Sequence, residues 1–339
     1  MDDLTFHPAL ERFNPARRTL VRLGSKIESA SAFFAKANVT IRPGFLYGDT
    51  FNSKAPVAYE LISALIRAEK IHKSTKIVAA TSGNTGLGIA QLCKALGLYC
   101  ELVMQNDTPS SKVGVITALG DPINTRQVTS STVQYAREQG EQPGWCNVDQ
   151  YSEQANPIAQ MKYLAPQLFD ENNGRIDLVV VAGGTLGTIT GLQRYIEEHE
   201  LKTKLVLALC ENGHEIPGAR DKVRVMRDVR FATPDTFEHQ MTATRYQAFL
   251  ASYAMFPEVE WTPGGPTSGL AYSVALRFLH QHALSETLEQ FRGPDERINL
   301  VFLCPDDYRP YGDLYRSTLN EHRDFFSSNI PIERLLEAS

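Results

Sequence analysis

Short apolar runs alternate with amphipathic stretches along most of the chain. Residues 76–80, KIVAA, are typical of a buried strand, and residues 87–96 place apolar side chains at helical spacing. The β-branched run DLVVVA at 177–182 indicates a strand covered on both faces, and a helix is expected at 188–198. Further strands are expected at 99–104, 204–209 and 299–303, and further helices at 109–119 and from Pro56. This alternation predicts parallel α/β layers.

Composition is typical of a globular protein with room for two domains. The chain has 339 residues, of which 42% are hydrophobic and 22% charged. Single hydrophobic cores stop growing at roughly 250–300 residues, so two domains are expected. The net charge of −5, without a long basic block, argues against nucleic-acid binding. No apolar run reaches the roughly 18 residues of a membrane span, and the N-terminus lacks a secretory pattern. The cytoplasm is therefore the expected compartment.

The cysteines point to no disulfide framework and no metal site. There are five of them, they are scattered, and none forms a C-x-x-C pair. We expect most to be buried small hydrophobic residues. They are Cys93, Cys100, Cys146, Cys210 and Cys304.

Two loops rich in glycine and hydroxyl residues follow buried strands. The first is TSGNTG at 81–86, and the second is GGTLGT at 183–188. In open parallel sheets, ligands collect at the carboxyl ends of the strands. Glycines let the backbone approach a ligand, and N–H groups at a helix start favour an anion. The first loop holds more polar residues than a helix cap requires, and the second suits a phosphate but lacks a Walker lysine.

A dinucleotide site is the main competing interpretation of the first loop. Its glycines, Gly83, Gly86 and Gly88, are spaced G-x-x-G-x-G rather than G-x-G-x-x-G. Glu101 lies at a suitable distance downstream, but inside an expected strand rather than at its end. The fingerprint of an NAD-binding oxidoreductase is therefore incomplete.

Motif order over nearly the whole chain resembles the β-family of pyridoxal phosphate enzymes, fold type II, which includes cysteine synthase and cystathionine β-synthase. TSGNTG looks like the substrate-carboxylate loop of that family. GTLGTITG at 184–191 looks like its phosphate loop, with Leu186 in place of a glycine. Further matching stretches are RTLVRL at 18–23, DQYSEQANP at 149–157 and GGPTSG at 264–269. The resemblance implies a two-domain α/β fold of the tryptophan synthase β type, with parallel or mixed sheets and flanking helices.

The resemblance also implies domain limits and an assembly. A small domain would span 45–159 and a large domain 1–44 plus 160–326, with a C-terminal surface tail at 327–339. A cofactor would lie in the cleft between them, and the protein would be a homodimer acting on a small amino acid.

Segment 213–237 is charged and poorly periodic, and we interpret it as a long connection rather than a mobile segment near a site.

A site for pyridoxal 5′-phosphate follows from the resemblance. Lys54, within a shortened version of the family's G-S-x-K-D-R motif, would form a Schiff base with the cofactor and later act as general base. An exposed surface lysine is the competing interpretation. Further cofactor contacts would come from Asn84, Gly184, Thr185, Gly187 and Thr188. The substrate would be held by Thr81, Ser82, Gly83, Thr85 and Gln150.

One departure from the family carries chemical information. Where the family has Pro-Ser, whose hydroxyl meets the pyridine nitrogen, this chain has Pro305 and Asp306. A carboxylate there would hold the nitrogen protonated, because an opposite charge stabilises the cation. A protonated ring is a stronger electron sink. The competing interpretation is that Asp306 caps a turn after the strand.

The resemblance implies β-replacement on serine or on an O-activated serine. Three alternatives stay open: β-elimination by an ammonia-lyase (dehydratase), racemisation, and a non-catalytic protein that binds pyridoxal phosphate. The identity of the nucleophile also stays open.

Overall fold

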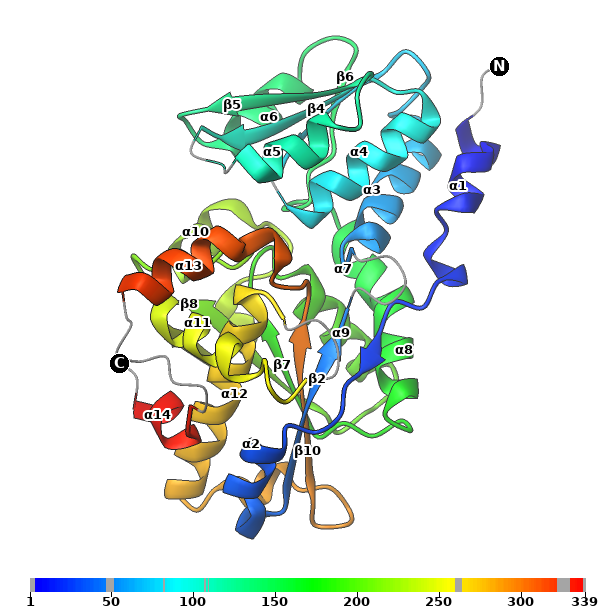
Figure 1. The fold of residues 1–339 in the computed structure, drawn as a ribbon. Coiled ribbons are helices and arrows are strands. Elements are labelled where there is room, and N and C mark those ends of the chain that lie inside the picture. The colour runs from blue at the N-terminus through cyan, green and yellow to red at the C-terminus, as the bar shows by residue number, and fades with distance from the viewer. Residues whose placement is uncertain are drawn as a thin grey trace.

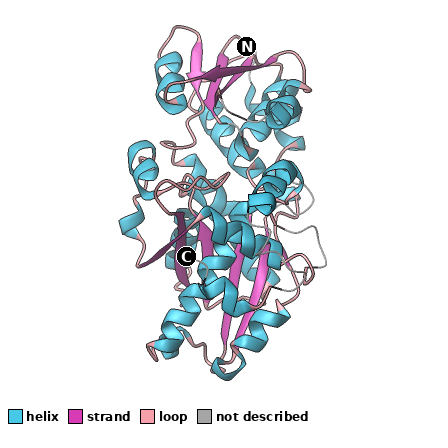
Figure 2. Ribbon diagram, turned by 60° about the vertical axis from the view of Figure 1, so that its left-hand side comes forward, coloured by secondary structure: helices cyan, strands magenta, loops and turns pink. Residues whose placement is uncertain are grey.

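The computed structural model describes residues 4–46, 52–81, 83–106, 108, 110–259, 264–321 and 330–337. Within these ranges the strands form two sheets, and helices cover both (Figures 1 and 2). None of the described helices has the length and apolar character needed to cross a bilayer.

The smaller sheet is parallel and has four strands in the order β5-β4-β3-β6. These are β3 (Lys76–Ala80), β4 (Cys100–Gln105), β5 (Ile123–Val128) and β6 (Trp145–Asn147). Its helices are α3 (Ala55–Arg67), α4 (Asn84–Leu96), α5 (Ser110–Thr117) and α6 (Thr132–Gly140). Helices α3 and α4 touch at Gly88, where a Cβ would lie 2.9 Å from that of Ala58. Only glycine allows this close approach without displacing α3.

The larger sheet has six strands in the order β1-β2-β10-β7-β8-β9. These are β1 (Arg22–Leu23), β2 (Val39–Phe45), β7 (Leu178–Ala182), β8 (Lys204–Cys210), β9 (His239–Ala243) and β10 (Ile298–Cys304). All neighbours are parallel except β1 and β2. The expected α/β class with parallel and mixed sheets is confirmed.

Two core clusters hold the layers together. The first runs from the smaller sheet through α3, α4 and α9 (Gly187–Glu198) to one face of the larger sheet. The second lies on the other face, under the long helix α12 (Pro266–Leu284). The remaining helices are α1 (Pro8–Arg12), α2 (Glu28–Phe33), α7 (Ala155–Ala159), α8 (Ala165–Glu171), α10 (Lys222–Asp228), α11 (Arg245–Ala254), α13 (Gly312–Glu321) and α14 (Ile332–Glu337). Because one cluster is continuous across both sheets, their relative position is fixed by packing.

The expected strands and helices lie close to those observed. Strand β3 has the expected bounds, β7 and β8 differ from expectation by one residue at one end, and β4 and β10 differ by one residue at each end. All five cysteines are buried, as expected. The expected tail at 327–339 contains α14, whose Ile332 and Leu335 are buried in the second cluster. The expected domain limit at residue 159 falls where α7 continues into a π-helical turn, Gln160–Leu164. The domain division stays a prediction.

Candidate active site

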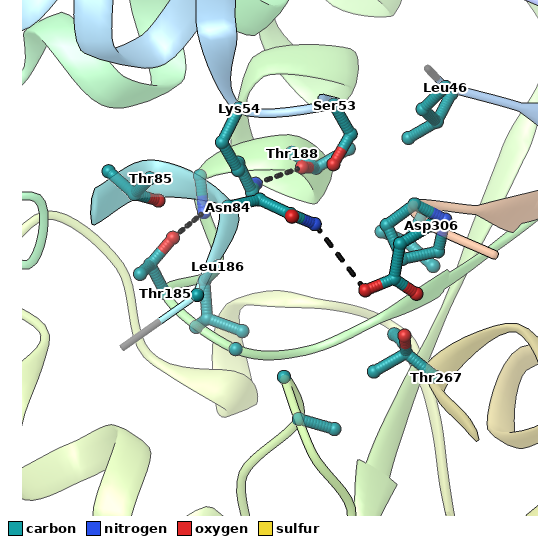
Figure 3. Close-up of a pocket in the computed structure, with 18 of the residues that line it drawn as sticks. Leu46, Ser53, Lys54, Asn84, Thr85, Thr185, Leu186, Thr188, Thr267 and Asp306 are labelled. Carbon is teal, nitrogen blue, oxygen red and sulfur yellow. Dashed lines mark hydrogen bonds between the residues drawn. The ribbon is translucent and has the colours of Figure 1, made fainter. Parts of the chain in front are cut away.

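A cavity of about 260 Å³ lies between the two sheets, at the carboxyl ends of β3, β7 and β10 (Figure 3). Its lining brings together the predicted site residues: Lys54, Thr81, Gly83, Asn84, Thr85, Gln150, Gly184, Thr185, Gly187, Thr188 and Asp306. Ser82 lies outside the described residues. Stretches that are far apart in the sequence therefore share one cavity.

Lys54 immediately precedes α3 and points into the cavity (Figure 3). Its Nζ donates a hydrogen bond to Oγ1 of Thr188, in the first turn of α9, at 3.0 Å. Burial lowers the pKa of Lys54 from 10.5 to about 8, because desolvation penalises the ammonium form. A much larger fraction of this amine is therefore neutral near physiological pH than of an exposed lysine, and the neutral form becomes dominant above about pH 8.

The turn that carries Lys54 is joined to the start of α4 by Asn52. Its side-chain oxygen accepts from the Lys54 backbone N–H at 2.9 Å. Its side-chain nitrogen donates to the backbone oxygen of Asn84 at 3.0 Å. Asn52 is buried. The position of Lys54 is therefore fixed relative to the glycine-rich loop after β3.

That loop folds around the side chain of Thr81. The Thr81 hydroxyl oxygen accepts from the backbone N–H of Gly86 at 3.1 Å and of Gly83 at 3.4 Å. A Cβ at Gly86 would lie 2.8 Å from the Thr81 methyl carbon, so the turn needs glycine there. Asn84 and Thr85 then begin α4 at the edge of the cavity.

The second loop joins β7 to α9 and is shaped by close contacts. A Cβ at Gly184 would lie 2.6 Å from the backbone oxygen of Gly218, and one at Gly187 would lie 2.1 Å from Oδ1 of Asn156. The loop is therefore restricted to glycine at both positions. Its N–H groups and the hydroxyls of Thr185 and Thr188 lie at the start of a twelve-residue helix, an arrangement that favours an anion.

Asn156 connects the second loop to Gln150. Its side-chain nitrogen donates to the backbone oxygen of Gln150 at 2.7 Å and to Oγ1 of Thr185 at 2.9 Å. The Gln150 side chain donates to the backbone oxygen of Ala80, at the end of β3, at 3.1 Å. Side chains from both sheets are thereby held in one network.

Asp306 follows β10 and faces Asn84 across the cavity (Figure 3). Its Oδ2 accepts a hydrogen bond from the hydroxyl of Tyr311 at 2.6 Å and from Nδ2 of Asn84 at 3.4 Å. Burial, then the Asp306 carboxylate, raise the pKa of Tyr311 well above its ordinary value. Tyr311 therefore stays protonated and acts as a donor to Asp306.

Sequence reasoning missed several residues of the cavity lining. Tyr151 and Arg220 lie there, with Arg220 Nη2 donating to the Tyr151 hydroxyl at 2.7 Å. The interpretation of 213–237 as a connection away from the site is wrong for residues 218–220, which line the cavity. The arginines of that segment were a usable signal. For Tyr311, the only signal in the sequence was its position close to Asp306.

Comparison with known proteins identifies a matching family and relatives. The family described as "Pyridoxal-phosphate dependent enzyme" matches residues 46–252, more than half of the chain. Cystathionine beta-synthase of Rattus norvegicus is 34% identical over 152 residues, which are 43% of this chain and 27% of that protein. Cysteine synthase B of Salmonella typhimurium is 29% identical over 165 residues, 47% of this chain and 54% of that protein.

The chain thus spans about a quarter to a half of the length of these curated relatives. A crystal structure of cysteine synthase from Entamoeba histolytica matches with a TM-score of 0.78 and 17% sequence identity, covering 98% of this chain and 96% of that one. This likeness shows the fold. The family resemblance expected from the motifs is confirmed.

Leu186 offers a test of the loop geometry. It replaces a glycine of the family pattern, has φ 61°, and its side chain is 2% exposed. A left-handed conformation costs a non-glycine residue about 1–2 kcal/mol. Leu186→Ala should destabilise the protein by about 2–5 kcal/mol, since it removes buried carbon and keeps this strain.

Leu186→Gly loses the same contacts but relieves the strain, so it should be more stable than Leu186→Ala by about 1 kcal/mol. Urea unfolding followed by circular dichroism measures the difference. An alanine variant as stable as the glycine variant would contradict the left-handed assignment.

Proposed function

Because the chain belongs to the pyridoxal-phosphate dependent enzyme family, we propose that it catalyses β-replacement on serine or an O-activated serine. The observation that carries the proposal is the buried amine of Lys54, with a pKa of about 8, beside the loop that begins α9. A lysine whose pKa lies near the working pH can serve as nucleophile and base. The names of the curated relatives, cysteine synthase and cystathionine beta-synthase, support the same reaction type.

The cavity has features that fit pyridoxal phosphate. The loop 184–188, which close contacts restrict to glycine at two positions, presents N–H groups and hydroxyls suited to a phosphate. Lys54 would hold the cofactor covalently through its aldehyde carbon. Asn84 and Asp306 would contact the ring, with Asp306 beside the pyridine nitrogen.

The loop after β3 would hold the substrate carboxylate. Thr81, Ser82, Gly83 and Thr85 would contribute N–H and hydroxyl groups from this loop. Gln150, which lies beside the end of β3, would complete the site. A carboxylate fits the start of α4 because helix N-termini carry partial positive charge.

Proton transfer is the task of Lys54. Bound pyridoxal phosphate withdraws electrons from the Cα atom of an amino acid and so weakens its Cα–H bond. The amine of Lys54, released from the cofactor when the amino group of the substrate takes its place, would accept that proton at Nζ, and Thr188 would orient the amine through its hydrogen bond. The Cβ–O bond then breaks, and its electron pair departs with acetate or phosphate. The nucleophile supplies the pair for the new Cβ bond, and Lys54 returns its proton to Cα.

A second candidate reaction is favoured by Asp306. A carboxylate held by Tyr311 at 2.6 Å would keep the pyridine nitrogen protonated and increase electron withdrawal. Stronger electron withdrawal would also promote β-elimination to a keto acid and ammonia, or racemisation. Product analysis separates the three, because replacement yields a new amino acid, elimination a keto acid, and racemisation the opposite enantiomer.

The assembly and the compartment stay predictions. The family resemblance supports a homodimer, with a small domain at 45–159 and a large domain of 1–44 plus 160–326. The cytoplasmic location is likewise an expectation from the sequence. Light scattering of the purified protein would establish the number of chains.

Lys54→Ala should lower turnover of O-acetyl-L-serine with sulfide by about 10³-fold or more, because the proton acceptor is lost. Assay of the new amino acid measures turnover, and the visible absorption spectrum reports whether the lysine-bound cofactor band is lost. Lys36→Ala is the control, since Lys36 is exposed. Near-normal turnover in the Lys54 variant would refute the assignment.

The pKa of Lys54 predicts how cofactor binding depends on pH. Only the neutral amine can attack the aldehyde, and a pKa lowered from 10.5 to about 8 makes that form dominant above pH 8. The association rate of pyridoxal phosphate with cofactor-free protein should therefore rise with pH, with a midpoint near pH 8. Stopped-flow absorbance measures this rate. A midpoint near that of an ordinary lysine would contradict the burial of the amine.

Asp306→Asn keeps the shape of the side chain but removes its charge. Turnover should fall by about tenfold or more, while the KM for O-acetyl-L-serine changes by less than about twofold, because the substrate carboxylate is held elsewhere. Tyr311→Phe should have a smaller effect in the same direction. Equal losses in kcat and substrate affinity would indicate general damage to the cavity instead.

A further inference from the structure

A second cavity, of about 390 Å³, adjoins the active-site cavity. Its lining includes Thr81, Tyr151 and Arg220, which also line the first cavity. Beyond these shared residues, Arg224 and Arg227 of α10 line only the second cavity. Figure 1 shows α10 below the four-stranded sheet. We refer to this second cavity as the arginine pocket.

The start of α6 also lines the arginine pocket. Residues 129–132, at the end of β5, line it with hydroxyl groups. Ser131 caps α6, a nine-residue helix, by accepting from the N–H of Gln134 at 3.3 Å. A helix N-terminus and guanidinium groups thus line one cavity, and both favour an anion.

The charge of the lining is positive. Arg220 and Arg227 share one carboxylate, that of Asp228, with Arg227 donating to it at 2.9 and 3.0 Å. Burial acts to raise the pKa of Asp228, but the two arginines outweigh it and lower that pKa. One carboxylate therefore faces two guanidinium groups, and Asp228 stays charged.

Arg224 pairs with carboxylates that lie outside the pocket. It pairs with Glu215 at 2.5 Å and Asp221 at 3.3 Å, and neither of these lines the pocket. The Glu215 side chain is 66% exposed, and exposed pairs are weak. Among the described residues, Nη1 of Arg224 and of Arg227 has no protein acceptor. These N–H groups are available to a ligand.

We propose that the arginine pocket binds a carboxylate of the acceptor substrate, the molecule whose nucleophile adds at Cβ. This rests on the β-replacement proposed above. The volume lies in the range of small-molecule pockets, roughly 300–1,000 Å³, and exceeds what hydrosulfide needs. A phosphate leaving group would lie beside the residues that line both cavities, such as Arg220. Arg224 and Arg227 line only the arginine pocket and not the active-site cavity. The acceptor is therefore a small organic acid that carries the nucleophile.

Matched thiols test the proposal with O-acetyl-L-serine as donor. We expect kcat/KM for 3-mercaptopropionate to exceed that for neutral 2-mercaptoethanol by about tenfold or more. Arg224→Gln/Arg227→Gln should lose about tenfold with 3-mercaptopropionate, and less than about twofold with 2-mercaptoethanol or hydrosulfide. Lys222→Gln is the control, because it removes a charge from the same helix outside the pocket. Equal losses with all three nucleophiles would overturn the proposal.

The donor is tested separately. Consumption of O-acetyl-L-serine and of O-phospho-L-serine is measured without an acceptor, and both rates should be similar in the double variant and in the Lys222 control. A selective loss with O-phospho-L-serine would assign the pocket to the leaving group and overturn the acceptor assignment.

A binding measurement keeps the test independent of turnover. Glutarate, which has no nucleophile, should bind the holoenzyme and the Lys222 control about tenfold more tightly than the double variant, by calorimetry. Absent or unchanged glutarate binding would overturn the proposal. A protein that forms no product with any nucleophile would refute β-replacement, and the glutarate result would still decide whether the pocket binds carboxylates.

Discussion

A primary amine buried inside a cavity, with its pKa lowered, is the constraint on which the rest of the site depends. The exclusion of water disfavours the charged form of Lys54, and its pKa falls to about 8. Its hydrogen bond to Thr188 joins the start of α3 to the start of α9. Both helix ends carry partial positive charge, which acts in the same direction as burial. The exclusion of water requires the two sheets to stay closed over the amine, and the core cluster that spans them provides this.

Much of the fold could be predicted from the sequence because buried parallel strands are short apolar runs. Strand β2 could not, although it lies between β1 and β10. Pro43 and Gly44 interrupt its apolar pattern, and its place depends on pairing with β10, more than 250 residues later. The polar strand β9 is defined in the same way by its neighbour β8. Tertiary pairing overrides local preference in such strands.

The candidate site was predictable where a motif is contiguous, as in the two glycine-rich loops. It was not predictable where contacts join distant residues. Arg220 reaches Tyr151 across 69 residues, and its guanidinium carbon lies 4.4 Å from the centroid of that ring. No local pattern reports such a contact. Asp306 was identified because it replaces a serine of the family pattern, whereas Tyr311 became visible only through the hydrogen bond that it donates.

The charges at the site are fixed by the protein before any ligand arrives. Arg220 is held by the Asp228 carboxylate and the Tyr151 hydroxyl, so its guanidinium lies in the lining of both cavities without needing an anion. Asp306 is held in the same way by Tyr311. Such preorganised groups need little reorganisation as charge develops during a reaction. A carboxylate therefore faces the expected position of the cofactor ring, and a guanidinium lies between the two cavities. Because a guanidinium attracts anions, this arrangement of charges suits a reaction in which an anionic acceptor approaches from the side of α10.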